Sequence, residues 1–271
     1  MTGGEKFVKF IAICLAFLLI CAILSAIFTG ISFLGIIFND DRMYGVPTGK
    51  NVSSYIEKLN IYVGAADLEV KEGEYLYVES DNDSIKIKEN NSVLTITEIK
   101  RPYDLNKTKK VTVYVPANMT FECINIETGA GFVDISSLNA EEFNLELGAG
   151  VALLSDITST YSTDIDGGAG ELKIEECEFA NLELDIGVGE CTASFRLKGE
   201  SDVYCGVSST NLTLYEYDKN DYTVKVDKGI GDVVVDGVSA KDNDVLGTGA
   251  NIVDISCGVG EVDVRFERRI Y

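Results

Sequence analysis

The chain has 271 residues, a formal net charge of -21, 26 glycines and no histidine. The negative charge argues against nucleic acid as a partner, because a phosphate backbone is bound by cationic surfaces that release counterions. The lack of histidine removes the usual base at neutral pH and the commonest zinc ligand. Cations and cationic peptides are the partners that this charge favours, and no cofactor is predicted.

An uncharged segment near the start of the chain is long enough to cross a membrane. Residues 10–38 contain no charged side chain, and about 20 apolar residues span a bilayer as a helix. A cleaved secretory signal is the competing interpretation, but its apolar region is only about 7 to 15 residues long. A lipoprotein signal is disfavoured because Cys21 follows the bulky residue Ile20. We therefore predict a single transmembrane helix over residues 10–38.

The charges that flank this segment predict its orientation. Lys6 and Lys9 precede it, whereas two aspartates and Arg42 follow it. Positively charged flanks stay on the cytoplasmic side of a membrane. Residues 1–9 are thus expected in the cytoplasm, and everything after the helix outside it.

Beyond the membrane segment, three regions are predicted. Residues 39–55 lack periodicity and indicate a linker. Residues 56–120 predict N-terminal strands and first coils, in which Pro116 marks a strand end because it cannot donate to a ladder. Asn-rich and Asp-rich turns at 81–84 and 89–92 separate the strands. The expected strands are 59–63, 75–78, 85–87, 93–96 and 111–115.

The third region, residues 121–271, repeats the motif Gly-x-Gly. The paired glycines are Gly129 and Gly131, Gly148 and Gly150, Gly168 and Gly170, Gly187 and Gly189, Gly229 and Gly231, and Gly258 and Gly260. First glycines at 129, 148, 168 and 187 are 19, 20 and 19 residues apart, and Gly206 continues the series. Later spacings lengthen to 23 and 29 residues, and residues 239–249 are interpreted as an insertion.

Apolar residues recur at fixed distances from each first glycine. The column three residues before it is Ile126, Leu145, Ile165, Leu184, Val203, Val226 and Ile255. Two further columns lie five residues before and six residues after the glycine. Alternation on both sides of the glycine pair predicts that one strand enters each corner and another leaves it. Units this short must stack to bury their apolar faces, which favours an all-β fold, a β-solenoid or β-helix of coils about 19 residues long. An up-and-down barrel or an antiparallel sandwich remains the alternative.

Three segments carry a resemblance to a known family. They are Val113-Tyr114-Val115-Pro116, Ile126-Glu127-Thr128-Gly129-Ala130-Gly131 and Cys257-Gly258-Val259-Gly260-Glu261-Val262. Residues 56–266 resemble the bacterial family known as putative adhesin or DUF4097. The resemblance implies a β-solenoid-like ectodomain on a bacterial membrane protein, and some members are associated with envelope stress. It supplies no catalytic residues, so it implies fold and location more than chemistry.

Two patterns could indicate a ligand site. A dinucleotide loop needs three glycines and a following helix, whereas strands follow here, so the glycines are interpreted as structural corners. Directly after the glycine pair stand the acidic residues Glu171, Glu190, Asp232 and Glu261. Stacked carboxylates could bind calcium, but nine-residue calcium repeats are absent and acidic faces are usually just solvated. They remain weak calcium candidates.

The remaining reactive residues favour structural roles. Five cysteines lie beyond the membrane segment, an odd number without a Cys-x-x-Cys pair, and are interpreted as core residues. A polysaccharide-active β-helix enzyme is a disfavoured alternative, because Arg196 is the only arginine between Arg101 and Arg265 and the sequence shows no partner for it.

The sequence therefore predicts a non-enzymatic, extracytoplasmic module anchored in a membrane, and the resemblance implies that the membrane is that of a bacterial cell. An adhesin-like binding or scaffold role is preferred, with an envelope protein, wall polymer or cationic peptide as partner. Envelope-stress sensing is the alternative. The binding site is expected on the faces between corners or in the stretched coils after Gly206.

Overall fold

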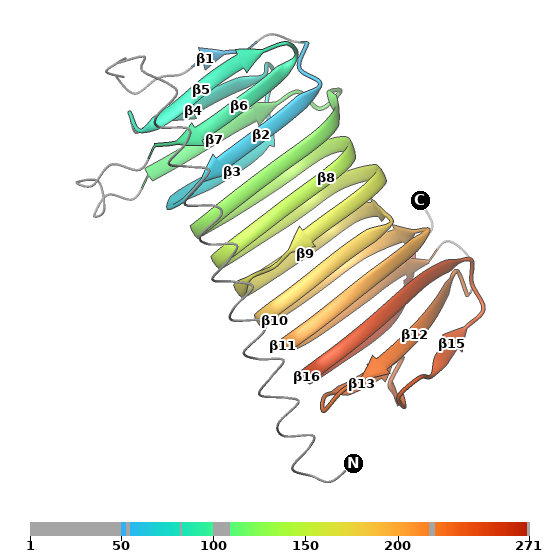
Figure 1. Ribbon diagram of the computed structural model, residues 1–271. Coiled ribbons are helices and arrows are strands. Elements are labelled where there is room, and N and C mark those ends of the chain that lie inside the picture. Colours follow the sequence, from blue (N-terminus) through green and yellow to red (C-terminus); the bar gives the residue numbers. More distant parts are fainter. Residues whose placement is uncertain (1–49, 53–54, 82, 100–108, 217–219, 270–271) are drawn as a thin grey trace. The chain divides into compact units, whose positions relative to one another are not determined.

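The computed structural model describes residues 50–52, 55–81, 83–99, 109–216 and 220–269. All regular structure in these residues is β (Figure 1). Within them, no helix has the length and apolar character needed to cross a bilayer. The predicted transmembrane segment 10–38 lies outside the described residues, as does most of the predicted linker.

The strands follow the predicted pattern, apart from two unpredicted elements before the repeats. They are β1 (Lys50–Asn51), β2 (Lys58–Val63), β3 (Ala66–Glu72), β4 (Tyr77–Ser80), β5 (Ile85–Asn90), β6 (Val93–Glu98), β7 (Lys109–Val115), β8 (Thr120–Asp166), β9 (Ala169–Ala180), β10 (Leu182–Lys198), β11 (Glu200–Glu216), β12 (Tyr222–Lys228), β13 (Asp232–Val235), β14 (Val238–Ser239), β15 (Val245–Gly247) and β16 (Asn251–Arg268). Strand β3 was not predicted, and β1 lies within the predicted linker. Pro116 directly follows the end of β7, as expected.

Successive coils stack in parallel and in the predicted register. Leu184 in β10 pairs with Ile165 in β8 on one side and with Val203 in β11 on the other. These partners are 19 residues away in each direction. Parallel pairing of consecutive coils is the property of a β-solenoid, and it excludes the antiparallel barrel and sandwich alternatives for residues 123–216.

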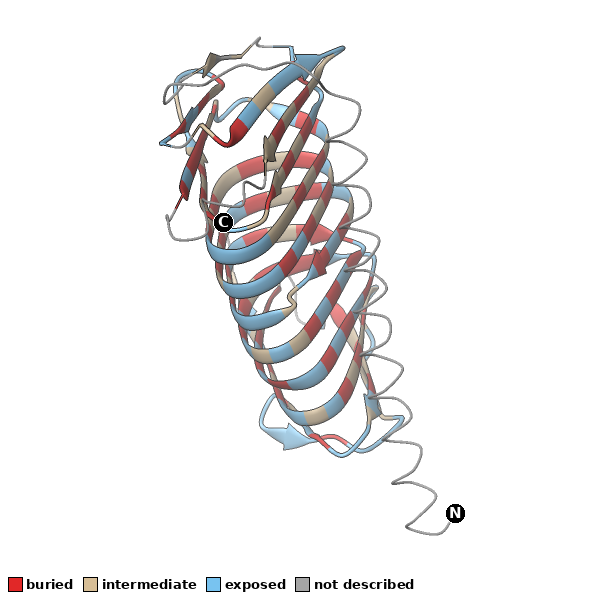
Figure 2. Ribbon diagram, turned by 60° about the vertical axis from the view of Figure 1, so that its left-hand side comes forward, coloured by how far each residue is buried: buried red, intermediate tan, exposed pale blue. Residues whose placement is uncertain are grey.

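The predicted apolar columns form the core. Every member of the column containing Leu184 is at most 3% exposed. The columns five residues before and six residues after the first glycine are buried as well, including their polar members Thr163 and Ser201. Figure 2 shows the resulting alternation of buried and more exposed positions along the coils. Period-two burial on both sides of the corner thus accounts for the spacing found in the sequence.

The glycine corners are positions of close approach between coils. A Cβ atom at Gly148 would lie 2.0 Å from the carbonyl oxygen of Gly129 in the preceding coil. The second glycine carries an additional requirement, because Gly189 has a φ of 144°, which side-chain-bearing residues rarely adopt. The extra residue of the third corner is accommodated at Gly167 and Gly168, where the strand is interrupted between β8 and β9.

At the C-terminal end, the coils do not stack in sequence order. The last strand, β16, lies between β11 and the earlier strands β12 and β13. The stretched spacings at Gly229 and Gly258 therefore reflect a chain that forms the outer coil first and then returns to insert the final coil inside it. The predicted insertion supplies β14 and β15, which pair antiparallel with β13 and β12.

At the N-terminal end, too, the coils do not stack in sequence order. The first coil, made of β2 and β3, lies between β8 and the later strands β6 and β7. Strands β4 and β5 then pair antiparallel with β7 and β6. Antiparallel strands at both ends cover edges that would otherwise offer unpaired backbone groups to other chains.

A buried ion pair completes the N-terminal end. The side chains of Glu98 and Lys109 are 4% and 6% exposed, and their charged atoms are 2.5 Å apart. The second carboxylate oxygen of Glu98 accepts hydrogen bonds from the backbone N–H groups of Gly64 and Ala65, at 2.7 and 2.9 Å. These contacts lower the pKa of Glu98 despite its burial, because they favour the ionised form. Glu98 thereby satisfies donors at the corner of the first coil.

The positive φ and the close approach of the neighbouring coil can be separated by comparing the corner glycine Gly189 with Gly237, which lies in the turn between β13 and β14. At Gly237, φ is 76° and an added Cβ would meet no atom within 4 Å, whereas at Gly189 it would lie 1.9 Å from the oxygen of Gly170. We expect Gly237→Ala to cost about 1 kcal/mol of unfolding free energy. Gly189→Ala should cost about 3 kcal/mol or more, since it adds a backbone clash to the unfavourable φ. Urea unfolding measures both, and equal losses would contradict the close-approach account.

Candidate functional site

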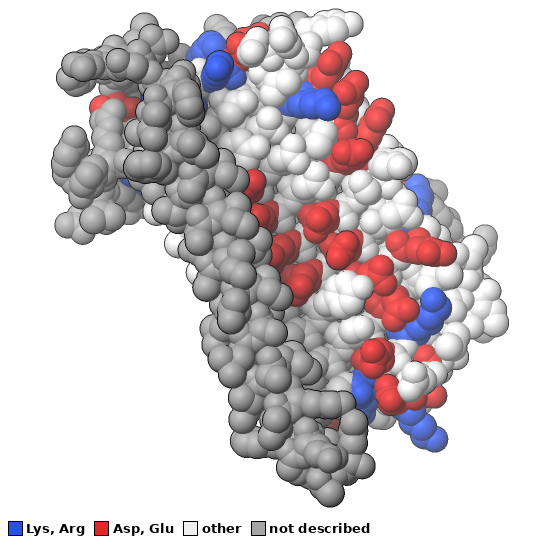
Figure 3. All heavy atoms as spheres, viewed as in Figure 1, with Lys and Arg blue, Asp and Glu red and all other residues white. Residues whose placement is uncertain are grey.

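The outward side of the strand that enters each corner carries two columns of side chains, most of them acidic in the middle coils. They alternate with the buried columns, so their side chains face solvent. We call the following residues the carboxylate face: Glu127, Glu146, Asp164, Asp166, Glu183, Asp185, Asp202 and Asp254. In Figure 3, acidic side chains gather over the middle of the viewed face. Sequence reasoning anticipated sites on faces between corners but did not single out these residues.

One of the two columns changes character along the stack. In the first coils it contains Asn60, Asn125 and Asn144. The amide of Asn125 donates to Asn60 at 2.8 Å, and that of Asn144 donates to Asn125 at 2.9 Å. An amide both donates and accepts, so asparagines can bond along a stack, whereas ionised carboxylates only accept.

The later coils place carboxylates in the same column. Asp164 is aligned with Glu183, Glu183 with Asp202, and Asp202 with Asp254. Adjacent strands are about 5 Å apart, at which two unit charges in water repel by about 0.8 kcal/mol. Among the described residues, one ion pair reaches the face, between Lys225 and Asp254 at 3.7 Å. Solvent therefore screens most of the repulsion between these carboxylates.

The protonation equilibria of these residues reflect that repulsion. The pKa of Glu146 is raised by partial burial and then by the charges of Asp166 and Asp164. Burial and neighbouring carboxylates likewise raise the pKa values of Glu127, Asp164 and Asp185. A raised carboxyl pKa means that the folded protein holds these negative charges at a cost. A cationic ligand would relieve that cost.

The predicted calcium candidates lie on the other side of the corner. Glu171 and Glu190 are adjacent, as expected, but Ser209 separates Glu190 from Glu261. Asp232 is next to Glu261, and its carboxylate is 2.8 Å from the amine of Lys228. In the part of the chain that the structure describes, no three acidic or cysteine side chains are grouped closely enough to hold a metal ion.

A shallow groove of about 730 Å³ follows this corner edge. The middle residues of the corners, Val188, Val207 and Val259, contribute apolar surface to it, and Val188 and Val207 are about half exposed. Glu190, Asp232 and Glu261 also line the groove. The corner edge therefore combines a row of exposed aliphatic side chains with carboxylates, beside the larger carboxylate face.

Four of the five cysteines in the described residues are core residues, as predicted. Cys123, Cys177, Cys191, Cys205 and Cys257 are all free thiols, and all except Cys123 are buried. Burial raises the pKa values of Cys177 and Cys191 to about 12. Thiols with such pKa values are poor nucleophiles at neutral pH.

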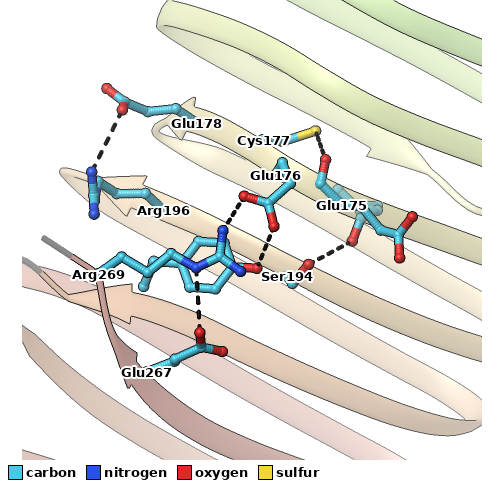
Figure 4. A network of polar contacts seen from close by, with 10 residues as sticks. Glu175, Glu176, Cys177, Glu178, Ser194, Arg196, Glu267 and Arg269 are labelled. Atoms are coloured by element: carbon cyan, nitrogen blue, oxygen red, sulfur yellow. Dashed lines mark hydrogen bonds and ion pairs between the residues drawn. The ribbon is translucent and has the colours of Figure 1, made fainter. Parts of the chain in front are cut away.

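A polar network connects the end of the C-terminal strand to two other coils (Figure 4). The guanidinium of Arg269 lies 3.8 Å from the centre of the Tyr215 ring and donates to Glu176 and Glu267. The Tyr215 hydroxyl also donates to Glu176, at 3.2 Å. These contacts join β9, β11 and the end of β16, which gives the network a structural role.

Arg196, close to this network, has a neighbour that the sequence did not reveal. It is 5% exposed, and its guanidinium is 4.0 Å from the carboxylate of Glu178 on β9. The pairing joins residues 18 positions apart on adjacent coils, so the expectation that nothing pairs Arg196 was wrong.

Comparison with known proteins identifies a family. Residues 56–267 match the family described as Toastrack DUF4097. No curated protein matches this sequence.

Solved bacterial structures are also similar to the chain. One is a putative cell adhesion protein from Clostridium sporogenes ATCC 15579, with 18% identity, a TM-score of 0.38, and coverage of 82% of this chain and 100% of that one. Another is a putative adhesin from Bacteroides fragilis NCTC 9343, with 10% identity, a TM-score of 0.36, and coverage of 81% and 96%. A putative adhesin from Parabacteroides distasonis ATCC 8503 has 13% identity, a TM-score of 0.33, and coverage of 81% and 96%.

The electrostatic cost of the carboxylate face can be measured as stability. We expect Asp164→Asn to stabilise the fold by about 0.5 to 1 kcal/mol at low salt, because it removes repulsion and extends the asparagine ladder from Asn144. Asp263→Asn is the control, since Asp263 already pairs with Arg265 at 2.6 Å, and it should stabilise nothing.

The pH dependence of stability tests the same point. Groups whose pKa is raised by folding bind protons more tightly in the folded state, so their contribution to unfolding free energy grows as pH falls through the raised pKa. The gain from Asp164→Asn should therefore shrink between about pH 7 and the acid range in which these carboxyls protonate. Urea unfolding of the wild type and the variant, at about pH 7 and in that acid range, measures the gain in unfolding free energy. A gain independent of pH would contradict the electrostatic account.

Proposed function

This chain belongs to the Toastrack DUF4097 family, and we propose that it is a binding module of the bacterial cell envelope. In this proposal the helix predicted over residues 10–38 anchors the β-solenoid to the membrane, with the solenoid outside the cytoplasm. The carboxylate face then binds a partner that carries several positive charges in a row, such as a cationic peptide segment. The role is adhesin-like, without catalysis.

The change of residue type within one column supports this proposal most directly. The same structural position is filled by hydrogen-bonded asparagines at Asn60, Asn125 and Asn144, by carboxylates from Asp164 to Asp254, and by Lys225 in the outermost coil. Because an amide fits that position and stabilises it, the fold does not require the carboxylates. Like charges aligned along a parallel stack are unfavourable unless a ligand or solvent screens them. Binding of a cationic ligand would explain why this position holds carboxylates despite their mutual repulsion.

The spacing of the face defines the class of partner. Each column holds four consecutive carboxylates about 5 Å apart, and the two acidic stretches overlap in the coils of Asp164 and Glu183, where they are about 7 Å apart along the strand. A chain with repeated ammonium or guanidinium groups can contact several carboxylates at once, whereas a single small cation can contact few. The proposal therefore favours an extended polycation over a metal ion.

The enzymatic alternative gains no support from the residues that could serve it. Arg196 is buried beside Glu178, and Arg269 is bound to Glu176, Glu267 and the Tyr215 ring. Both arginines hold coils together. We therefore do not propose a polysaccharide-directed activity.

Binding of a lysine-rich peptide to the detergent-solubilised chain tests the proposed face. We expect the triple variant Asp164→Asn, Glu183→Gln, Asp202→Asn to lose at least about tenfold in affinity. The wild-type affinity should also fall steeply between about 50 mM and 500 mM salt. A matched variant, Glu171→Gln, Glu190→Gln, Glu261→Gln, removes as many exposed charges on the other side of the corner and should bind normally. Equal losses in both variants would show attraction to net charge rather than to this face.

The location of the module is tested separately. Folded solenoids resist general proteases, so we suggest a site-specific protease sequence inserted within residues 39–49 of the predicted linker. The protease added to intact cells should release the folded part, because the positive-inside rule places it outside. Release only after the membrane is permeabilised would reverse the proposed topology.

A further inference from the structure

A second potential site lies at the N-terminal end of the solenoid, away from the carboxylate face. A hollow of about 230 Å³ opens beside the turn between β3 and β4. We call it the tyrosine pocket, and its lining consists of Gly73, Glu74, Tyr75, Tyr77, Glu79 and Tyr114. No part of the repeating pattern predicts it, since these residues precede the first Gly-x-Gly pair.

Strand pairing places two of the rings side by side. Tyr114 on β7 is aligned with Tyr77 on the antiparallel strand β4, and their ring centres are 5.9 Å apart at an angle of 42°. Gly73 permits the turn to pass close to this pair, because a Cβ there would lie 2.6 Å from the Cβ of Tyr114. The backbone N–H of Gly73 also donates to the oxygen of Val115 at 2.9 Å. The wall of the pocket is therefore formed before any ligand arrives.

Each of two rings donates its hydroxyl hydrogen to a glutamate of the lining. The Tyr75 hydroxyl is 2.8 Å from Glu74, and the Tyr114 hydroxyl is 3.5 Å from Glu79. A phenol that donates to a carboxylate gains negative charge on its ring, which strengthens the attraction of the ring face for a cation. Glu74 and Glu79 form no ion pair with a basic side chain among the residues described here. The lining is thus aromatic and negative.

Tyr114 already has a cation near one face. The amine of Lys71, held by Glu69 at 2.7 Å, is 5.2 Å from the centre of the Tyr114 ring. Lys71 is aligned with Tyr114 from β3, whereas Tyr77 is aligned with it from β4 on the opposite side. The chain's own lysine therefore shows that this ring accepts a cation within the usual distance of about 6 Å.

We propose that the tyrosine pocket binds a quaternary ammonium group, of the kind that choline carries. Such a group is apolar in shape, weakly hydrated and positively charged, so aromatic faces and nearby carboxylates recognise it together. A sugar would also stack on tyrosines, but it presents hydroxyl donors and acceptors alike, and the side chains of this pocket provide carboxylates and phenols rather than amide or basic donors. This site is independent of the proposed polycation face and uses different residues.

Titration of the full chain with choline tests the proposal, in a polyoxyethylene detergent that has neither an ammonium nor a sugar headgroup. The matched probe is 3,3-dimethyl-1-butanol, which has the shape of choline without the charge. We expect choline to bind at least about tenfold more tightly than the neutral probe. Equal binding of the two would show a merely apolar hollow, and no binding of choline at millimolar concentration would overturn the site.

Variants locate the binding and separate it from the carboxylate face. Tyr75→Leu should weaken choline binding several-fold without affecting folding, because Tyr75 is 67% exposed, and Tyr75→Phe should retain most of it. Glu74→Gln combined with Glu79→Gln should weaken it as well. The variant Asp164→Asn, Glu183→Gln, Asp202→Asn should bind choline normally, so a failure here is distinguishable from a failure of the proposed function. Binding of N-acetylglucosamine oligomers in place of choline would overturn the proposal in favour of a glycan site.

Discussion

The close approach of neighbouring coils at the glycine corners is the constraint on which the rest of the structure depends. At each corner, the carbonyl oxygen of one coil occupies the place that a Cβ would need on the next, as between Gly170 and Gly189. Because the backbones meet there directly, the strands on both sides of the corner start in the same register in every coil. That shared register turns a loose sequence repeat into continuous columns of side chains.

The same register has opposite consequences inside and outside. Inside, like stacks on like, and aliphatic columns such as the one through Leu184 are buried almost completely. Outside, in the column that runs from Asn60 to Asp254, the register aligns like side chains, which suits an asparagine and penalises an aspartate. Asn144 bonds to Asn125, whereas the carboxyl pKa of Asp164, one coil further on, is raised. The carboxylate face therefore stands out because the fold gives no structural reason for it.

The period and the core could be read from the sequence because both are local properties of each coil. The columns that contain Leu184, Phe143 and Ile174 are fixed by alternation around a glycine, and they are buried as predicted. Strand β3 was missed because its corner reads Gly64-Ala65-Ala66, which lacks the second glycine. The stacking order at the C-terminal end could not be predicted. Strand β16 alternates between buried and outward residues just as β12 and β13 do, so the sequence does not show which of them lies next to β11. Nor could the pairing of Arg196 with Glu178, because it joins different coils.

The two ends of the solenoid differ from its middle in the kind of site they can form. A repeating lattice places equivalent residues beside one another, so its faces present rows, and rows suit extended partners with repeated charges. A compact pocket needs unlike residues around one point, which requires the repeat to be broken. The chain reversal that places β4 against β7 does this, because it brings Tyr77 and a turn carrying Glu74 and Tyr75 next to Tyr114. The strands that protect the N-terminal edge thereby create an open hollow in which a small ligand can contact different side chains, so the end of the solenoid suits a small molecule and its face suits a polycation.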